Sequence, residues 1–378
     1  MKRMLTFIAV LLVFCVFAFA VNAENADDII KRHLEGSGAL DSYEQIPDKT
    51  ADEIEKYFDK ELTVENVESF LDFKKFLNYI LKSFFKVFKN EAVILGVIVS
   101  IILLNKFFKS ICSTYFSTTT QYIVDIACVL TLVVSVSVNV TSAASEISKM
   151  IEQITTFTQA LMPVMATLTA SSGEVASSAV VSVFLFMGCQ ICAYIASHLL
   201  LPLVNIYFAC VIFESLILDV NFSAIGNLIK KIISIAMGTL LTGFIAMMSL
   251  QSVLSGAGDT LAKRGVKFAV GALLPVASGM LSEAMESVFS CANVARSMTG
   301  VFGIVVIIFI VITPVLLVLS KYLLFKFSAF AGTILSEGKI TAFLEGCSGV
   351  FALLLALTMV CCIILISAFT LVVITIPK

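Results

Sequence analysis

The sequence predicts an all-α polytopic membrane protein that carries a small helical domain outside the cytoplasm at its N-terminus. Hydrophobic residues make up 59% of the 378 residues and charged residues 14%, with a mean hydropathy of +1.02, whereas soluble domains carry about 25% charged residues. The charges are also segregated, because residues 24–72 hold 15 of the 27 acidic residues. Most of the remaining chain consists of apolar runs long enough to cross a bilayer.

Residues 1–23 have the pattern of a secretion signal peptide. Lys2 and Arg3 form its charged start, Leu5 to Ala20 its apolar core, and Val21-Asn22-Ala23 its site of small residues. We expect cleavage after Ala23, with an uncleaved first helix as the alternative. In both cases the segment that follows, residues 24 to about 90, is expected outside the cytoplasm.

The exported part is expected to have two pieces. Residues 24–72 form an acidic helical segment, in which Thr50 and Glu53 make a capping box. Residues 73–90 form a basic amphipathic helix with apolar residues, such as Phe76, on one face and lysines on the other. This helix suits the membrane interface and its lipids. A soluble helix packed against the neighbouring acidic segment is the alternative.

Residues 91–378 form the polytopic membrane domain. The hydropathy predicts about seven transmembrane helices, at residues 92–108, 121–143, 175–197, 199–220, 232–252, 300–320 and 347–376. Two shorter apolar stretches, near 155–172 and 268–292, contain Pro163 and Pro275 and are expected to be re-entrant, interfacial or broken segments.

The two proline segments also indicate a possible internal repeat. Ala160-Leu161-Met162-Pro163-Val164 recurs as Ala272-Leu273-Leu274-Pro275-Val276, and the same offset moves the predicted span 121–143 onto 232–252. The register fails further on, so chance similarity is the alternative. Lysines flank the span at 232–252 on both sides, which leaves the topology open.

Catalytic and metal-binding residues are scarce. His33 and His198 are the two histidines, and no HExxH motif or Ser/His/Asp set can be assembled around them. Cys189 and Cys192 form a CxxC within an apolar span, where packing is the favoured interpretation. We therefore expect no enzyme activity, no cofactor and no metal.

The candidate functional residues are acids and prolines at membrane depth or at its edge, because an ionisable group there is costly and points to function by default. Solvated caps at the interface are the alternative for most of the acids. The candidates are Asp125, Pro163, Glu174, Glu214, Pro275, Glu283 and Glu286.

Taken together, the signal peptide, the acidic exported segment and two apolar motifs resemble the stage III sporulation protein AE family over essentially the whole chain. The motifs are Ala160 to Val164 with Ser171-Ser172-Gly173-Glu174, and Leu273 to Met280 running on to Ser297-Met298-Thr299-Gly300. The resemblance implies a permease-like subunit of a channel complex that the mother cell assembles against the forespore. It also implies sibling proteins of the same operon and stage II sporulation protein Q as partners.

Two functional hypotheses follow. The first is a non-enzymatic membrane subunit of that channel or secretion complex, needed for forespore development and located in the mother-cell membrane around the forespore. The second is an autonomous secondary transporter with a site at a repeat interface near the midplane. Membrane lipids are expected to bind in both cases, and nucleic acid in neither.

Overall fold

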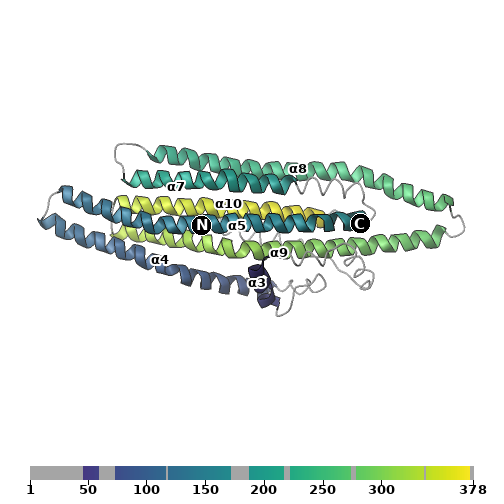
Figure 1. Ribbon diagram of the computed structural model, residues 1–378, viewed down its shortest axis with the longest axis horizontal. Helices are drawn as coiled ribbons and strands as arrows, with labels where there is room; N and C mark the ends of the chain where they lie inside the picture. The colour runs from purple at the N-terminus through teal and green to yellow at the C-terminus, as the bar shows by residue number, and fades with distance from the viewer. Residues whose placement is uncertain are drawn as a thin grey trace.

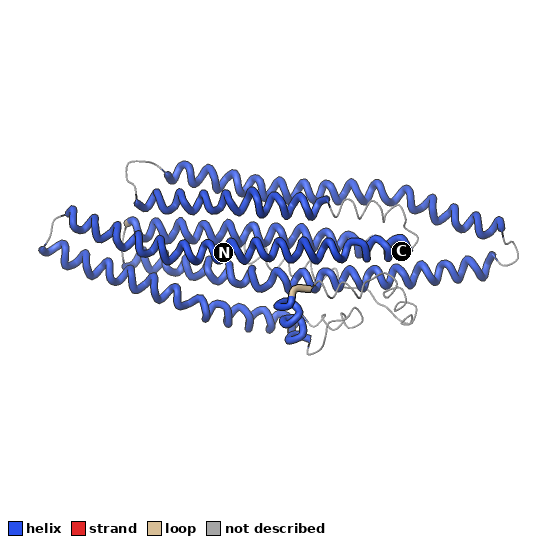
Figure 2. Tube along the Cα trace, viewed as in Figure 1, coloured by secondary structure: helices blue, strands red, loops and turns tan. Residues whose placement is uncertain are grey.

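The computed structural model describes residues 46–58, 73–115, 118–171, 187–216, 222–273, 278–335 and 338–374. These residues are almost entirely helical, and the described part of the chain contains no strand (Figure 2). The prediction of an all-helical fold is confirmed. The signal peptide and residues 24–45 lie outside the described residues.

Six long helical segments lie side by side and form an elongated bundle (Figure 1). Their bounds are α4 Phe73–Tyr115, α5 Thr118–Ser171, a segment Met187–Leu216 that ends in α7 Leu201–Leu216, α8 Phe222–Leu273, α9 Ser278–Leu335 and α10 Lys339–Ile374. Each contains a candidate membrane span of 26 residues or more, about 39 Å at 1.5 Å per residue. The chain is thus a multi-pass membrane protein by its helices.

The helices α9 and α10 form the centre of the bundle. In each of them 72% of the most apolar stretch of 18 residues is buried inside the bundle, whereas the value for α4 at the periphery is 11%. Large aromatic side chains fill this centre, for example Phe325 and Phe351, whose rings stack at 4.8 Å. The peripheral helices keep apolar side chains exposed, as expected where lipid rather than water is the neighbour.

The number of spans differs from the prediction, since six long apolar helices, rather than seven, lie within the described residues. The expected boundary near residue 198 falls inside one continuous helix, Met187–Leu216. A π-helical turn, η3 Ala196–Leu200, ends two residues before Pro202, and the Leu201 N–H donates to Ala196 O. This wider turn accommodates a proline whose ring would otherwise clash with the carbonyl four residues earlier.

The expected break at Pro163 is also absent, because α5 continues through this residue to Ser171. The stretch 155–172 is therefore largely the end of a long helix. Pro163 itself is exposed, whereas Leu161, Met162, Val164 and Met165 are buried on either side of it. This packing holds the helix together despite the lost hydrogen bond.

The second proline motif is placed differently. Leu273 is the last residue of α8 and α9 begins at Ser278, so Pro275 lies outside the described residues. The two motifs thus occupy different positions relative to their helices, and the internal repeat stays a hypothesis. Proximity of Pro163 and Pro275 also stays a prediction.

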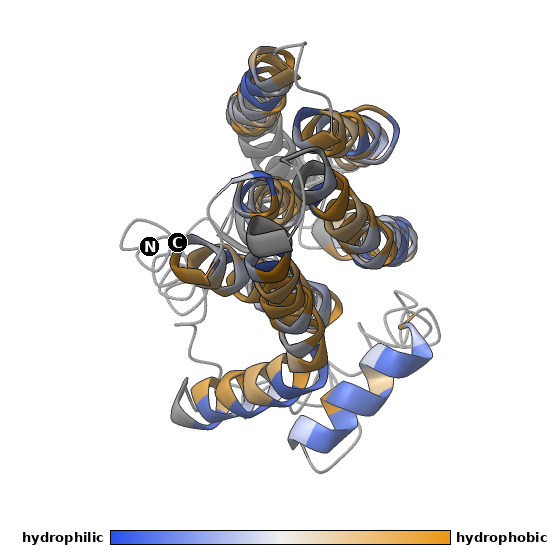
Figure 3. Ribbon diagram, turned by 90° about the vertical axis from the view of Figure 1, so that its left-hand side faces the viewer, coloured by the Kyte–Doolittle hydropathy of each residue, from blue (hydrophilic) through white to orange (hydrophobic). Residues whose placement is uncertain are grey.

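The residues expected to form an interfacial helix, 73–90, are the first part of α4 and continue without interruption into the first span. The short helix α3 Asp48–Phe58 lies against α9 and beside the start of α4 (Figure 1). Figure 3 shows that α3 is largely hydrophilic, unlike the hydrophobic helices of the bundle. The expected acidic segment 24–72 thus contains one helix in its described part, and its extracytoplasmic placement stays a prediction.

Candidate functional site

Lys321 is a charged side chain buried inside the membrane body. It lies on α9, only 4% of its side chain is exposed, and its Nζ is 3.1 Å from Oε2 of Glu91 on α4. The same Nζ donates a 2.8 Å hydrogen bond to Oδ1 of Asn139 on α5. The amide of Asn139 donates in turn to the Ser135 carbonyl at 3.0 Å. We call Glu91, Asn139 and Lys321 the central cluster.

The central cluster joins the consecutive helices α4 and α5 to α9, which follows much later in the sequence. A lysine without a partner in an apolar interior carries a desolvation cost of several kcal/mol. Glu91 supplies the opposite charge and Asn139 a further acceptor, so the cation is compensated only while α4, α5 and α9 stay together. The cluster is thus both a polar site at membrane depth and a constraint on helix packing.

A second cluster, which we call the peripheral cluster, joins α4 to α5. Asn105 is fully buried, and its Nδ2 donates to Oδ1 of Asp125 at 3.0 Å. Lys109 Nζ lies 2.7 Å from Oδ2 of the same carboxylate. The Lys109 side chain is 31% exposed and that of Asp125 20%. Asp125 therefore accepts from two donors on the neighbouring helix.

An apolar layer lies between the two clusters. On α4 it consists of Ile98 and Ile102, and on α5 of Leu132 and Val136, all with no exposed surface. Side chains of this kind exclude water from the contact between the helices. The two clusters are therefore separate sites in this conformation.

Asp125 is the one expected acid that takes part in a described cluster. Pro163 and Glu214 are exposed, and Glu214 lies in the last turn of α7. Glu174 and Pro275 lie outside the described residues. Glu283 and Glu286 belong to α9, but their side chains lie outside the described part. Their roles stay predictions.

Sequence reasoning missed the central cluster. Lys321 directly follows the predicted span 300–320 and resembled a flanking charge, and Glu91 directly precedes the predicted span 92–108. Lys321 nevertheless has apolar neighbours on both sides, with Val318 and Leu319 before it and Leu323 and Leu324 after it. A lysine inside such an apolar run was the sequence signal that could have identified Lys321 as a buried charge.

A family profile decides the identity of the chain. The profile of stage III sporulation protein AE matches residues 53–376, from within α3 to beyond the end of α10. The chain belongs to this family. The match includes all residues of both polar clusters.

One curated relative of the family is the stage III sporulation protein AE of Bacillus subtilis (strain 168). It is 26% identical to the chain over 179 residues. The aligned part covers 47% of this chain and 45% of the relative, so the chain spans less than half the length of the curated relative it matches. No solved structure matches the chain.

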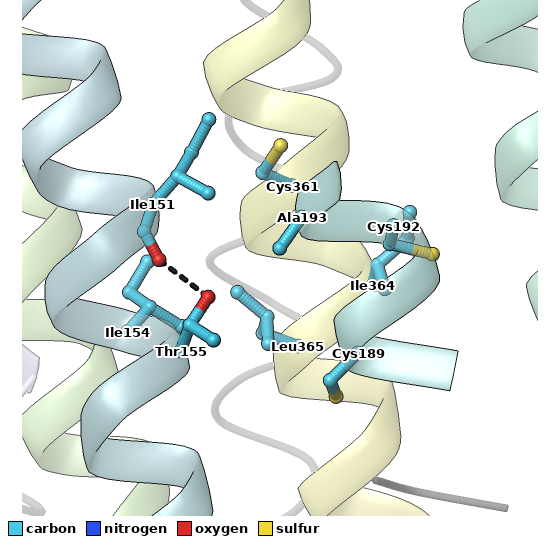
Figure 4. Close-up of a pocket in the computed structure, with 9 residues that line it drawn as sticks. All are labelled: Ile151, Ile154, Thr155, Cys189, Cys192, Ala193, Cys361, Ile364 and Leu365. Atoms are coloured by element: carbon cyan, nitrogen blue, oxygen red, sulfur yellow. Dashed lines mark hydrogen bonds between the residues drawn. The ribbon is translucent and has the colours of Figure 1, made fainter. Parts of the chain in front are cut away.

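The CxxC cysteines line a small apolar pocket between α5, the helix 187–195 and α10 (Figure 4). Cys189 and Cys192 face Cys361 across this pocket, but the sulfur atoms point away from one another in Figure 4. The Thr155 hydroxyl donates to the carbonyl of Ile151 in its own helix at 2.7 Å. The pocket thus presents apolar surface and thiols, without a charged group.

His198 is the one histidine in the described residues. Its ring stacks on Tyr194 at 4.5 Å, and its Nδ1 lies 2.9 Å from the Ser197 hydroxyl. The described residues contain no group of three or more His, Cys, Asp or Glu side chains that could hold a metal ion. His198 is accordingly placed as an exposed, stacked side chain on a membrane helix.

Proposed function

We propose that this chain is a non-enzymatic membrane subunit of a sporulation channel complex between mother cell and forespore. The observation that carries the proposal is the family match over residues 53–376, which includes part of α3 and all six candidate spans. The proposed partners are the sibling proteins of the same operon and stage II sporulation protein Q. The polar clusters support a structural role, because each charge in them is paired with another side chain.

We further propose an orientation for the bundle. The end of α4 and the start of α5, the end of α7 and the start of α8, and the end of α9 and the start of α10 lie at the same end of the molecule, on the left of Figure 1. The basic residues nearest to these helix ends are Lys106, Lys109, Lys230, Lys231, Lys326 and Lys339. Loops rich in lysine and arginine stay in the cytoplasm. Lys263, Arg264 and Lys267 lie toward the other end of α8, so the expected signal peptide decides between the two orientations. Because it places residues 24–72 outside the cytoplasm, the end on the left of Figure 1 is assigned to the mother-cell cytoplasm and α3 to the space between the membranes.

The proposal is tested by affinity purification from sporulating cells in a mild detergent, with a tag on the C-terminus. Sibling stage III proteins and stage II sporulation protein Q should co-purify with the tagged chain. The controls are an unrelated tagged multi-pass protein from the same cells and the tagged chain from vegetative cells. Recovery of the chain alone from sporulating cells, at normal abundance, would contradict the proposal.

An autonomous transporter is the second candidate, and the central cluster favours it, since charged residues at membrane depth often mark substrate or ion paths. The purified chain in liposomes should then take up solute or protons without any partner. Lys321→Met should abolish uptake, whereas Lys149→Met should leave it unchanged, because Lys149 lies in an exposed pair with Glu146. Absence of uptake from the wild-type chain would remove this candidate.

A further inference from the structure

The exported helix α3 sits in an aromatic seat formed by two membrane helices. Ile54 and Tyr57 of α3 are 2% and 3% exposed. The Tyr57 ring lies 6.1 Å from Phe76 and 5.4 Å from Tyr79, both on α4, and 5.6 Å from Phe309 on α9. The helix α3 is thus packed where α4 meets α9.

A polar contact fixes the same seat. The hydroxyl of Thr313 on α9 donates to the Glu53 carboxylate, with 3.0 and 2.9 Å to its two oxygens. Thr313 lies one turn beyond Phe309 on α9. The α9 side of the seat therefore combines a ring contact with a charge-assisted hydrogen bond.

The central cluster lies further along the same two helices. On α4, Glu91 follows Tyr79 by twelve residues, or about 18 Å of helix. On α9, Lys321 follows Thr313 by eight residues, or about 12 Å. Because α4 is one unbroken helix from Phe73 to Tyr115, the seat near its start and the ion pair at Glu91 hold two points of the same rigid helix.

We propose that the α3 seat and the Glu91–Lys321 pair form one coupled latch that holds α4 against α9. Displacement of α3 loosens the ion pair inside the membrane, and loss of the ion pair loosens α3 outside it. A protein that engages the exported segment would thereby act on the contact between α4 and α9 in the membrane body. This inference concerns the conformation of the chain itself and does not depend on the proposed function.

The physical reason for coupling is that both contacts require the same position of α4. A buried ion pair tolerates little separation, since each charge loses its compensation when the partner moves away. Aromatic contacts at 5.4 to 6.1 Å are equally sensitive to a shift of the helix. A rigid element with two such contacts transmits the loss of one to the other.

The test uses the purified full-length chain in lipid nanodiscs, with the native cysteines replaced and a single reporter cysteine at Ile54. The rate of maleimide labelling at this buried position measures how often α3 leaves its seat. Glu91→Gln should raise that rate about tenfold, which equals about 1.4 kcal/mol. The exchange of the two charges, Glu91→Lys with Lys321→Glu, should restore slow labelling.

Matched controls separate coupling from general unfolding. A cysteine at the exposed Glu55 should label at the same rate in every variant, and one at the fully buried Val350 on α10 should stay unlabelled. Lys106→Gln removes an exposed charge on α4 outside the latch and outside both polar clusters, and it should leave labelling at Ile54 unchanged.

A reciprocal arm leaves the ion pair intact and stays informative if the pair variants do not fold. Thr313→Val removes the contact to Glu53 and should increase labelling of a cysteine at Ile98, a position on α4 with no exposed surface. Unchanged labelling in both arms, with Val350 protected, would overturn the latch. The latch would also be overturned if the cysteine at Ile54 still labels fast in the variant Glu91→Lys with Lys321→Glu while the cysteine at Val350 remains protected.

Discussion

At the scale of single residues, partners determine whether a charged side chain is tolerated inside the membrane body. Lys321 and Asp125 are both held by groups on other helices, and each has a second polar contact from an asparagine. Such groups stabilise a particular packing of helices mainly because the unpaired alternative is costly. An exposed pair such as Glu146 with Lys149 contributes little by comparison.

This difference gives a prediction for Asp125. Asp125→Ala leaves buried Asn105 and half-buried Lys109 without their acceptor, so we expect a loss of about 1–3 kcal/mol in the free energy of unfolding. Glu146→Ala is the matched control and should change it by less than about 0.5 kcal/mol. Unfolding of the purified protein by increasing SDS, followed by circular dichroism, measures both. If Asp125→Ala and Glu146→Ala lower the free energy of unfolding equally, the peripheral cluster is only a surface contact.

At the scale of elements, close helix contacts depend on small residues. Gly346 and Gly349 of α10 face Val211 and Tyr207 of α7. A methyl group on Gly346 would collide with Cγ1 of Val211 and lie 3.0 Å from its Cγ2. Glycine at this position therefore lets α7 approach α10, as small residues do between membrane helices.

We predict that Gly346→Ala destabilises the protein by about 1–3 kcal/mol, because the added methyl overpacks the contact between α7 and α10. The control is Gly96→Ala on α4, where no described atom lies within 4 Å of the added methyl. This change should be neutral or stabilising, since alanine favours helix by about 1 kcal/mol over glycine. SDS titration of both variants gives the comparison. Rescue of Gly346→Ala by Val211→Ala is expected, and its failure would indicate another cause.

At the scale of the whole molecule, the described residues contain an even number of long apolar helices. If each helix crosses the membrane once, the chain enters the first and leaves the last on the same side. The start of α4 and the end of α10 lie away from the helix ends on the left of Figure 1, where α4 ends and α10 begins. The expected secretion signal requires the same orientation, since it places residues 24–72 outside the cytoplasm.

The corresponding prediction concerns the C-terminus. Green fluorescent protein fused after residue 117, 220 or 337 should fluoresce, because these joins are assigned to the cytoplasm. Alkaline phosphatase fused after Lys378 should be active, because six spans return the chain to the exported side. Expression levels of each fusion are compared by immunoblot. A fluorescent protein that is bright at the C-terminus would require an odd number of spans.

Hydropathy and motifs were enough to predict the membrane class, the helical fold and the family, because they are local properties of the sequence that do not depend on contacts. Which charges pair and which helices continue became visible in the packed structure alone. Asn139 and Lys321 are 182 residues apart, and no pattern near either residue identifies its partner. Likewise, the sequence pattern at Pro163 predicts a break, but buried neighbours on both sides hold α5 intact. Pairing and continuity depend on packing between distant segments, and that information is absent from any single stretch of the chain.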